Sequence, residues 1–137
     1  MTAAETGHLV ISTLHTNGTA NAIDRMIDAF PASQQAQARV QLAMVLETVV
    51  AQQLIPDRSG GLLPVFEILH MNSATRSLVR EGKTHQLGAA IASGSAEGMI
   101  SMDQALLAHF RSGEITRETA LAYADSPEQL QRRLQTV

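Results

Sequence analysis

The stretch from Leu9 to Leu14 most constrains what this chain can fold into. Its sequence, Leu-Val-Ile-Ser-Thr-Leu, is a short apolar run rich in β-branched residues, which is typical of a strand buried on both faces in a parallel sheet. Such a strand needs a neighbour on each side, and parallel neighbours arrive through crossovers of a dozen or more residues. Because few other strands of this kind follow, we expect the chain to be the later part of a larger α/β domain whose first half lies outside it.

Polar side chains gather at the far end of this run, where Thr13, His15 and Thr16 precede Asn17-Gly18. Ligands of open α/β sheets bind beyond the carboxyl ends of the strands, so we predict that these side chains contact a ligand. An interpretation in which His15 only hydrogen-bonds neighbouring backbone stays open. His8 is at an odd spacing from His15, and strand alternation would place the two rings on opposite faces, so we do not expect them to share a metal ion.

The composition excludes several classes of function. With 45% apolar and 17% charged residues in a length of 137, the chain can build one globular domain. A net charge of −3 without a basic block does not suggest a nucleic-acid surface. The absence of cysteine excludes disulfides, thiolate zinc sites and a cysteine nucleophile. No apolar run approaches the ~20 residues of a membrane span, and no signal peptide is evident, so we expect a cytoplasmic protein.

The first half of the chain predicts two helices and a hairpin. We expect a helix over 19–29 capped by Thr19, a long helix over 33–53 capped by Ser33, and a β-hairpin over 54–69 that turns at Gly60-Gly61. Glu67 stands between apolar residues of the second strand. It could imitate the acid of a Walker B strand, but we expect it to face water or one arginine.

The second half predicts short helices. These cover 73–80 after Asn72 or Ser73, 84–93, 102–112 after a Ser101–Gln104 capping box, 117–124 after Thr116, and a last helix after a Ser126–Gln129 box. We expect His109 to be a half-buried packing residue. Gly82-Lys83-Thr84 matches the end of a phosphate loop, but Ser77 occupies the position of the first glycine and a helix precedes it, so we reject a nucleotide loop there.

Two motifs carry a resemblance to a known family. Ala3-Ala4-Glu5-Thr6-Gly7-His8-Leu9-Val10 with Thr13-Leu14-His15-Thr16 resembles the His box of secretion and pilus ATPases, which are RecA-like hexameric motors. The segment 74–81 resembles the Ala-Ile-Arg-Asn-Leu-Ile-Arg-Glu signature of type IV pilus retraction (twitching motility, PilT-like) ATPases. It matches that signature at Ala74, Arg76, Leu78, Arg80 and Glu81, and departs from it at Thr75 and Ser77. Extension and type II secretion relatives usually carry a tetracysteine site, which this chain lacks.

The resemblance implies an α/β fold: the C-terminal part of a RecA-like P-loop NTPase domain over residues 1–70, followed by a bundle of short α-helices over 71–137. It implies that His15 senses the γ-phosphate of ATP, that Thr13 and Thr16 support it, and that His8 begins the same box. It implies that the helix with Arg76 and Arg80 serves retraction. The intact family member would use ATP and Mg²⁺, form a hexamer, and contact inner-membrane pilus base proteins from the cytoplasm.

We therefore expect a truncated piece of a hexameric ATP-driven motor for pilus retraction and twitching motility. Because Walker A and Walker B are lacking, we expect neither tight ATP binding nor hydrolysis by this chain alone. One alternative is a stand-alone helical module that docks on a pilus or secretion motor. Another, a metal-dependent hydrolase using His8 and His15, is disfavoured by strand alternation. Open sheet edges and uncovered apolar surface would favour an oligomer or a partly molten chain.

Overall fold

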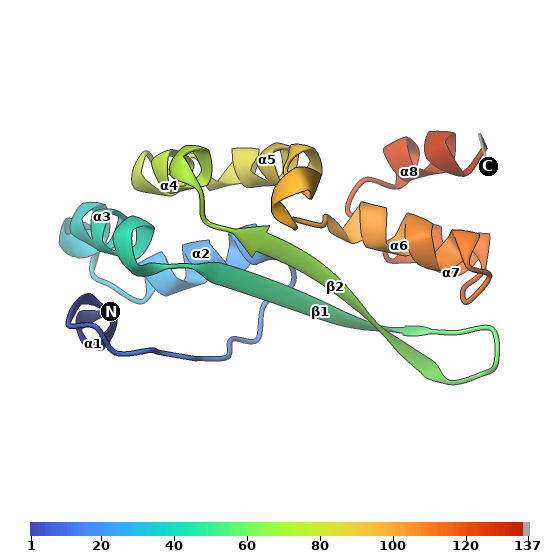
Figure 1. Cartoon of the computed structure of the whole chain (residues 1–137), viewed down its shortest axis with the longest axis horizontal. Helices are drawn as coiled ribbons and strands as arrows, with labels where there is room; N and C mark the ends of the chain where they lie inside the picture. The colour runs from blue at the N-terminus through green and yellow to red at the C-terminus, as the bar shows by residue number, and fades with distance from the viewer. Residues whose placement is uncertain (136–137) are drawn as a thin grey trace.

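A long antiparallel hairpin forms the centre of the computed structural model, which describes residues 1–135 (Figure 1). Strand β1 (Thr48–Pro56) pairs with β2 (Leu62–His70) over nine residues, from Thr48↔His70 to Pro56↔Leu62. The turn is held by Asp57, whose Oδ1 accepts hydrogen bonds from the N–H groups of Ser59 and Gly61 at 2.7 and 2.8 Å. Gly60 adopts a φ of +86°, a backbone conformation that favours glycine.

The helices are distributed unevenly around the hairpin. In Figure 1, α4, α5, α6 and α8 lie above it, α2 and α3 lie at one end, and the N-terminal stretch with α1 runs below β1. The α-helices are α1 (Thr2–Glu5), α2 (Thr19–Asp28), α3 (Gln35–Val45), α4 (Ser73–Arg80), α5 (Leu87–Ser93), α6 (Met102–Arg111), α7 (Arg117–Ala122) and α8 (Pro127–Leu134). Short 3₁₀ turns cover Ala32–Gln34, Thr84–Gln86 and Ser95–Glu97. No described helix has the length and hydropathy to cross a membrane.

Two hydrophobic clusters divide the core between the two ends of the hairpin. The first contains Ile23, Ile27, Leu42, Ala43, Leu69, Val79, Leu87, Ile91 and Met99. The second contains Ile55, Val65, Met102, Leu106, Ile115, Ala120, Leu130 and Leu134. Strand β2 contributes to both, because Val65 and Leu69 alternate onto the same face and lie far enough apart to reach different clusters.

Local sequence signals placed several elements correctly. Helix α2 matches the helix expected over 19–29, and α4 begins after Asn72, whose side chain accepts a hydrogen bond from the Thr75 N–H at 2.9 Å. The Ser101–Gln104 capping box is present, and Thr116 caps α7. The hairpin turn lies where the glycine pair predicted it. His109 is half-buried, as expected, and its ring also pairs with Glu114 at 2.7 Å.

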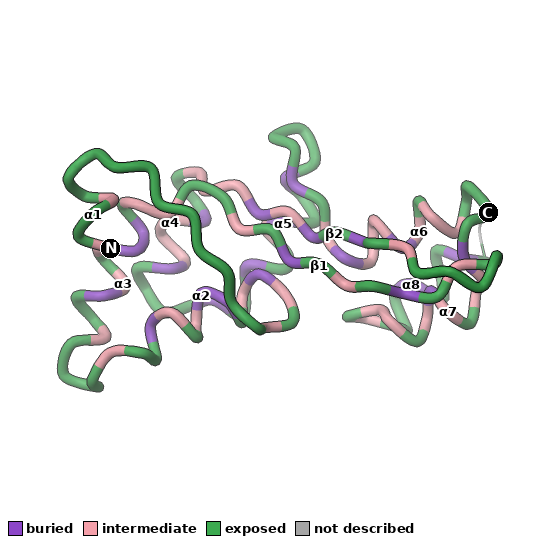
Figure 2. Tube along the Cα trace, turned by 90° about the horizontal axis from the view of Figure 1, so that it is seen from below, coloured by how far each residue is buried: buried purple, intermediate pink, exposed green. Residues whose placement is uncertain are grey.

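The buried strand expected over 9–14 is not formed. Residues 8–16 have no regular secondary structure, and Figure 2 draws most of this stretch as exposed. Leu9 is 90% and Ile11 84% exposed. The physical reason is pairing: the only named strands in the described part of the chain are β1 and β2, which pair with each other, so no neighbour covers this run.

The prediction of one long helix over 33–53 is wrong for its C-terminal part, which forms a strand. Helix α3 ends at Val45, and residues 48–53 belong to β1. Thr48, Val49 and Val50 are β-branched and favour a strand, and pairing with 68–70 decides the outcome. The same apolar residues also fit a helical stripe, and this pattern led to the wrong prediction of a helix.

Two predicted N-caps are wrong, and a third is in place but lacks the predicted capping-box hydrogen bond. Thr19 is the first residue of α2 rather than its N-cap, and its hydroxyl donates to Glu67 instead. Ser33 lies in the 3₁₀ turn before α3, whose N-cap is Gln34. Ser126 is the N-cap of α8 but makes no side-chain cap hydrogen bond, and there Pro127 supplies the helical start.

Candidate functional site

The candidate site begins with the His15 segment, defined as residues 8–17. His15 and Thr13 are exposed and Thr16 is half-buried. Within residues 1–135, the side chains of these three residues make no hydrogen bond, so the backbone-bonded interpretation of His15 is not what the structure shows. An exposed imidazole without a protein partner is free to meet a ligand or another chain.

His8 makes its own contacts near the N-terminus. The Nδ1 atom of His8 lies 3.1 Å from the Thr6 hydroxyl oxygen and 3.2 Å from the Ala3 carbonyl oxygen, next to the end of α1. Among the described residues, no three His, Cys, Asp or Glu side chains are placed to hold a metal ion. The structure therefore offers nothing in favour of the metal-dependent hydrolase.

The His15 segment ends in a tight turn at Asn17-Gly18-Thr19. Gly18 has a φ of +81°, and a Cβ added there would meet Glu67 Oε1 at 3.8 Å. The Asn21 amide donates a hydrogen bond to the Asn17 carbonyl at 2.7 Å, which closes the turn onto α2. The direction in which the segment leaves the folded body is thus set by this turn.

Glu67 anchors that turn from β2. Its Oε1 accepts hydrogen bonds from the Thr19 N–H and the Thr19 hydroxyl, both at 2.8 Å, and its Oε2 accepts one from the Met102 N–H at 3.4 Å. The residue is 5% exposed, so the expectation that it faces water or one arginine is wrong. The carboxylate is satisfied instead by the N-terminal ends of α2 and α6, whose helix dipoles favour negative charge.

Sequence reasoning missed Glu67, although a signal was present. Val65, Glu67 and Leu69 alternate along one strand, and all three are buried. An acid flanked at i−2 and i+2 by core residues lies on the core face, and burial then requires partners that donate hydrogen bonds.

A depression opens beside the turn, and its lining includes one further acid, Asp125, and one histidine, His85. It is lined by Asn17, Gly18, Thr19, Ala20, Asn21, Glu67, Thr84, His85, Gly88, Ile91 and Asp125, and His15 lies outside this lining. Asp125 is exposed as a residue, yet partial burial of its carboxyl, followed by repulsion from Glu67 and Asp103, raises its pKa. Asp103 in turn accepts hydrogen bonds from the backbone N–H of Asp125 at 2.9 Å.

The retraction-signature helix is α4, which packs beside α3. The Arg76 guanidinium donates to the carbonyl oxygens of Ala43 at 2.7 Å and Met44 at 3.1 Å, and pairs with Glu47 at 2.9 Å. It therefore caps the C-terminal end of α3, where cations are favoured. Arg76 carries a structural contact whatever else it does.

The other signature residues are more open. Ala74, Arg80 and Glu81 are exposed, and Leu78 packs half-buried against the first cluster. Within residues 1–135, the Arg80 side chain makes a single long hydrogen bond, to the Ser77 hydroxyl at 3.5 Å. A hydrogen bond from Lys83, then one from the Ser77 hydroxyl and the positive charge of Lys83, hold the pKa of Glu81 below its usual value. Arg80 is thus the signature cation that remains available at the surface.

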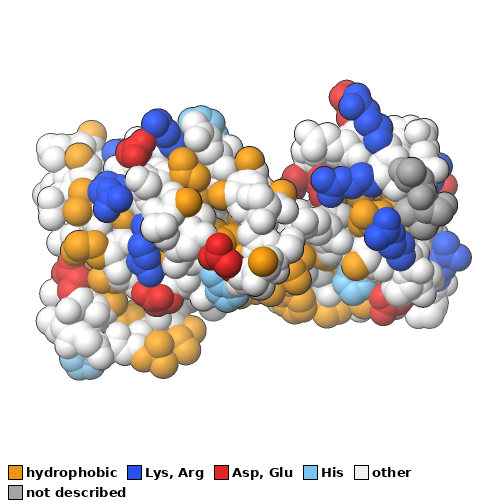
Figure 3. All heavy atoms as spheres, turned by 45° about the horizontal axis from the view of Figure 1, so that its top comes forward, with side chains coloured by type: hydrophobic (Ala, Val, Ile, Leu, Met, Phe, Trp, Pro, Cys, Tyr) orange, Lys and Arg blue, Asp and Glu red, His pale blue; other side chains and the backbone are white. Residues whose placement is uncertain are grey.

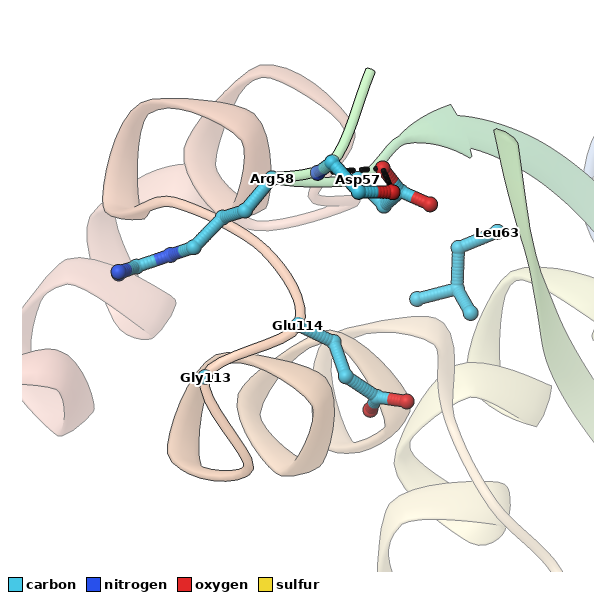
Figure 4. Close-up of a pocket in the computed structure, with 6 residues that line it drawn as sticks. Asp57, Arg58, Leu63, Gly113 and Glu114 are labelled. Carbon is cyan, nitrogen blue, oxygen red and sulfur yellow. Dashed lines mark hydrogen bonds between the residues drawn. The ribbon is translucent and has the colours of Figure 1, made fainter. Parts of the chain in front are cut away.

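A second depression lies at the tip of the hairpin (Figure 4), and no residue of the His15 segment lines it. It is lined by Asp57, Arg58, Ser59, Leu63, Gly113 and Glu114. The Arg58 N–H donates to the Glu114 carbonyl at 2.9 Å, and its side-chain Nε donates to the Ile115 carbonyl at 3.2 Å. Arg58 therefore joins the hairpin turn to the connection between α6 and α7. Its contacts in this depression are structural.

Comparison with known proteins identifies one group of relatives. Residues 1–61 match the family described as "Type II/IV secretion system protein". The chain is 42% identical over 131 residues to the twitching motility protein of Neisseria gonorrhoeae, covering 95% of this chain and 35% of the relative. It is 43% identical over 128 residues to the type IV pilus retraction ATPase PilT of Pseudomonas aeruginosa, covering 93% and 37%.

The fold is similar to that of a solved structure as well. A crystal structure of the pilus retraction motor PilT with bound ADP aligns with a TM-score of 0.81 and 40% identity, covering 96% of this chain and 36% of that one. The mixed α/β fold expected from the sequence is confirmed by this likeness. The chain spans about a third of the length of the curated relatives it matches.

Proposed function

We propose that this chain, a member of the type II/IV secretion ATPase family, is the part of a pilus retraction motor that senses bound nucleotide. It matches the C-terminal portion of the retraction motors of that family. The observation that carries the proposal is the 0.81 TM-score alignment over 96% of the chain with a retraction motor that holds ADP. His15, which is exposed and makes no hydrogen bond with other described residues, agrees with it.

His15 would contact the γ-phosphate side of ATP, with Thr13 and Thr16 beside it. A neutral or protonated imidazole can donate a hydrogen bond to phosphate oxygen, and threonine hydroxyls can do the same. Magnesium and the other phosphate ligands would come from elsewhere in the motor. The His15 segment is presented on the surface, as such a shared site requires.

The chain by itself is not proposed to be an ATPase. Phosphoryl transfer depends on positioning the phosphates and neutralising their charge. The 137 residues contain no Gly-x-x-x-x-Gly-Lys-Ser/Thr sequence. Assembly into a hexamer at the cytoplasmic face of the inner membrane, against pilus base proteins, belongs to the same proposal, as does the division into a core part over 1–70 and a helical part over 71–137.

Exchange of segments tests the proposal directly. The 128 matched residues replace their counterparts in the Pseudomonas PilT relative, and phosphate release by the chimaera is measured. We expect activity that falls at least about 100-fold in His15→Ala, the scale expected when a transition-state contact is removed. His109→Gln, changed far from the His15 segment, is the matched control and should keep the activity. An active chimaera whose rate is indifferent to His15→Ala would contradict the assignment.

The second candidate function is a docking module for such a motor. The specific observation in its favour is apolar surface left open: Leu9 and Ile11 in the His15 segment, and Val50 and Leu54 on β1, are each more than half exposed. Figure 3 shows apolar side chains open at the surface between the two ends of the molecule. This function would be favoured over the first by two results together. The 137-residue chain would co-purify with the intact PilT relative, and His15→Ala would leave ATP hydrolysis by the chimaera unchanged.

A further inference from the structure

Glu67 is the one buried carboxylate among the described residues, and the proposed nucleotide contact does not use it. It takes part in none of the three ion pairs found in residues 1–135. Its charge is met by three hydrogen-bond donors that come from two helices far apart in the sequence. The carboxylate, which is 5% exposed, is held to α2 by two short hydrogen bonds and to α6 by one longer one.

The two helices belong to different parts of the molecule. Helix α2 follows directly on the His15 segment and packs in the first hydrophobic cluster through Ile23 and Ile27. Helix α6 packs in the second cluster through Met102 and Leu106. One oxygen of Glu67 holds the start of α2, and the other holds the start of α6. A shift of either helix start therefore changes the hydrogen bonding of the same carboxylate.

The turn between the His15 segment and α2 has little other support. Gly18 imposes no side chain, and the Asn21–Asn17 hydrogen bond joins the turn only to α2 itself. Within residues 1–135, the Thr19–Glu67 contacts are the hydrogen bonds that join this turn to parts of the fold other than α2. The position from which the His15 segment departs thus depends on where Glu67 lies.

We propose that Glu67 is a positioning residue that couples the C-terminal helices to the His15 segment. Movement at the start of α6 reaches the Asn17-Gly18-Thr19 turn through the two oxygens of this carboxylate. The proposal rests on the proposed function only for what the His15 segment contacts. The coupling itself is a property of this chain and exists without nucleotide.

Amide hydrogen exchange on the whole chain measures the coupling. The variant Ser101→Ala removes the side-chain cap of α6, where Ser101 Oγ accepts from the Gln104 N–H at 3.3 Å. Loss of a cap should raise exchange of the Met102 amide about fivefold. If Glu67 couples the two helices, the Thr19 amide should exchange faster as well, although it lies outside α6.

Glu67→Gln completes the cycle. Its amide has a single accepting oxygen, so it cannot serve Thr19 and Met102 together. In this background, Ser101→Ala should still speed exchange at Met102 but no longer change exchange at Thr19. Because Ser101→Ala leaves Glu67 in place, its effect can be read even if Glu67→Gln fails to fold.

Asn72→Ala is the matched control. It removes the same kind of capping box from α4, which makes no hydrogen bond to Glu67. We expect it to leave Thr19 exchange unchanged. Equal acceleration of Thr19 by Asn72→Ala and Ser101→Ala would reveal general loosening and overturn the proposal, as would a Ser101→Ala effect confined to Met102. No nucleotide enters these measurements, so their outcome is separate from that of the chimaera.

Discussion

The guanidinium of Arg76 donates a 2.7 Å hydrogen bond to the carbonyl oxygen of Ala43, in the last turns of α3. This contact joins the signature helix α4 to the helix that precedes the hairpin. The neighbouring signature residue Arg80, one turn further along α4, is exposed and makes no comparable contact among the described residues. The two arginines of one motif therefore have different physical roles.

Replacement of Arg76 by alanine should destabilise the fold, whereas the same change at Arg80 should not. Arg76→Ala leaves two carbonyls of α3 without their charged donor, and we expect a loss of about 1–3 kcal/mol of unfolding free energy. Arg80→Ala should stay within about 0.5 kcal/mol of the parent chain. Urea unfolding followed by circular dichroism measures both. Equal effects of the two changes would contradict the assigned roles.

The hydroxyl of Thr19 should matter more than its methyl group. Thr19→Val removes one donor from the buried Glu67 carboxylate, which should cost about 1–3 kcal/mol of unfolding free energy. Thr19→Ser keeps the hydroxyl and should retain most of the stability. The same urea titrations compare the two variants with the parent chain. A valine variant as stable as the serine variant would mean that water or another group satisfies Glu67.

Replacement of Asp125 by asparagine should stabilise the chain at neutral pH. Partial burial, together with repulsion from Glu67 and Asp103, raises the pKa of Asp125 in the folded state. A raised carboxyl pKa favours folding below the unfolded pKa, and this contribution is lost as the pH rises through the folded pKa. Asp125→Asn should therefore be more stable than the parent at pH 7, and the gain should vanish in acid.

Glu114 supplies the control of opposite sign for Asp125. The hydroxyl of Ser112, then the ring of His109, lower the pKa of Glu114 by hydrogen bonding. This contribution is present above the unfolded pKa and is lost as the pH falls through the folded pKa. Glu114→Gln should lose stability at pH 7 and approach the parent chain in acid. Urea midpoints at pH 7 and pH 3 separate the two trends.

The His15 segment should tolerate a charge where a buried strand would not. Ile11 is 84% exposed, so Ile11→Asp should change the unfolding free energy by less than about 0.5 kcal/mol. Ile23 is fully buried, and Ile23→Ala should cost about 2–5 kcal/mol. Ile11→Asp should also weaken self-association in sedimentation experiments, because it interrupts an open apolar edge. Unfolding by Ile11→Asp would show that this stretch is packed after all.

Short-range signals carried most of what the sequence predicted correctly. Helix α2 has a clear apolar stripe, Ser101 and Gln104 bond each other locally, and the glycine pair marks a turn without any distant partner. These features depend on residues within one helical turn or one hairpin loop, so a local pattern contains them.

The larger errors depend on partners remote in sequence. Residues 48–50 became a strand because residues 68–70 were there to pair with them, and a helical stripe could not reveal this. The apolar run at 9–11 lacks such a partner within the described chain and stays open. Glu67 is buried because Thr19 and Met102, 48 and 35 residues away, supply its donors. His15 is exposed, and its role as a nucleotide contact stays a prediction.

The shared strand β2 also protects the molecule against mispaired states. Val65 and Leu69 face the core at opposite ends of the hairpin, in separate clusters. Sliding β2 by one residue would turn both side chains, and Glu67 between them, toward solvent at once. Insertions in the loop around Ser59 leave the pairing of β1 with β2 intact. A deletion within either strand shifts this pairing and disrupts both hydrophobic clusters. Natural variation in length should therefore accumulate at the tip of the hairpin and be rare along its arms.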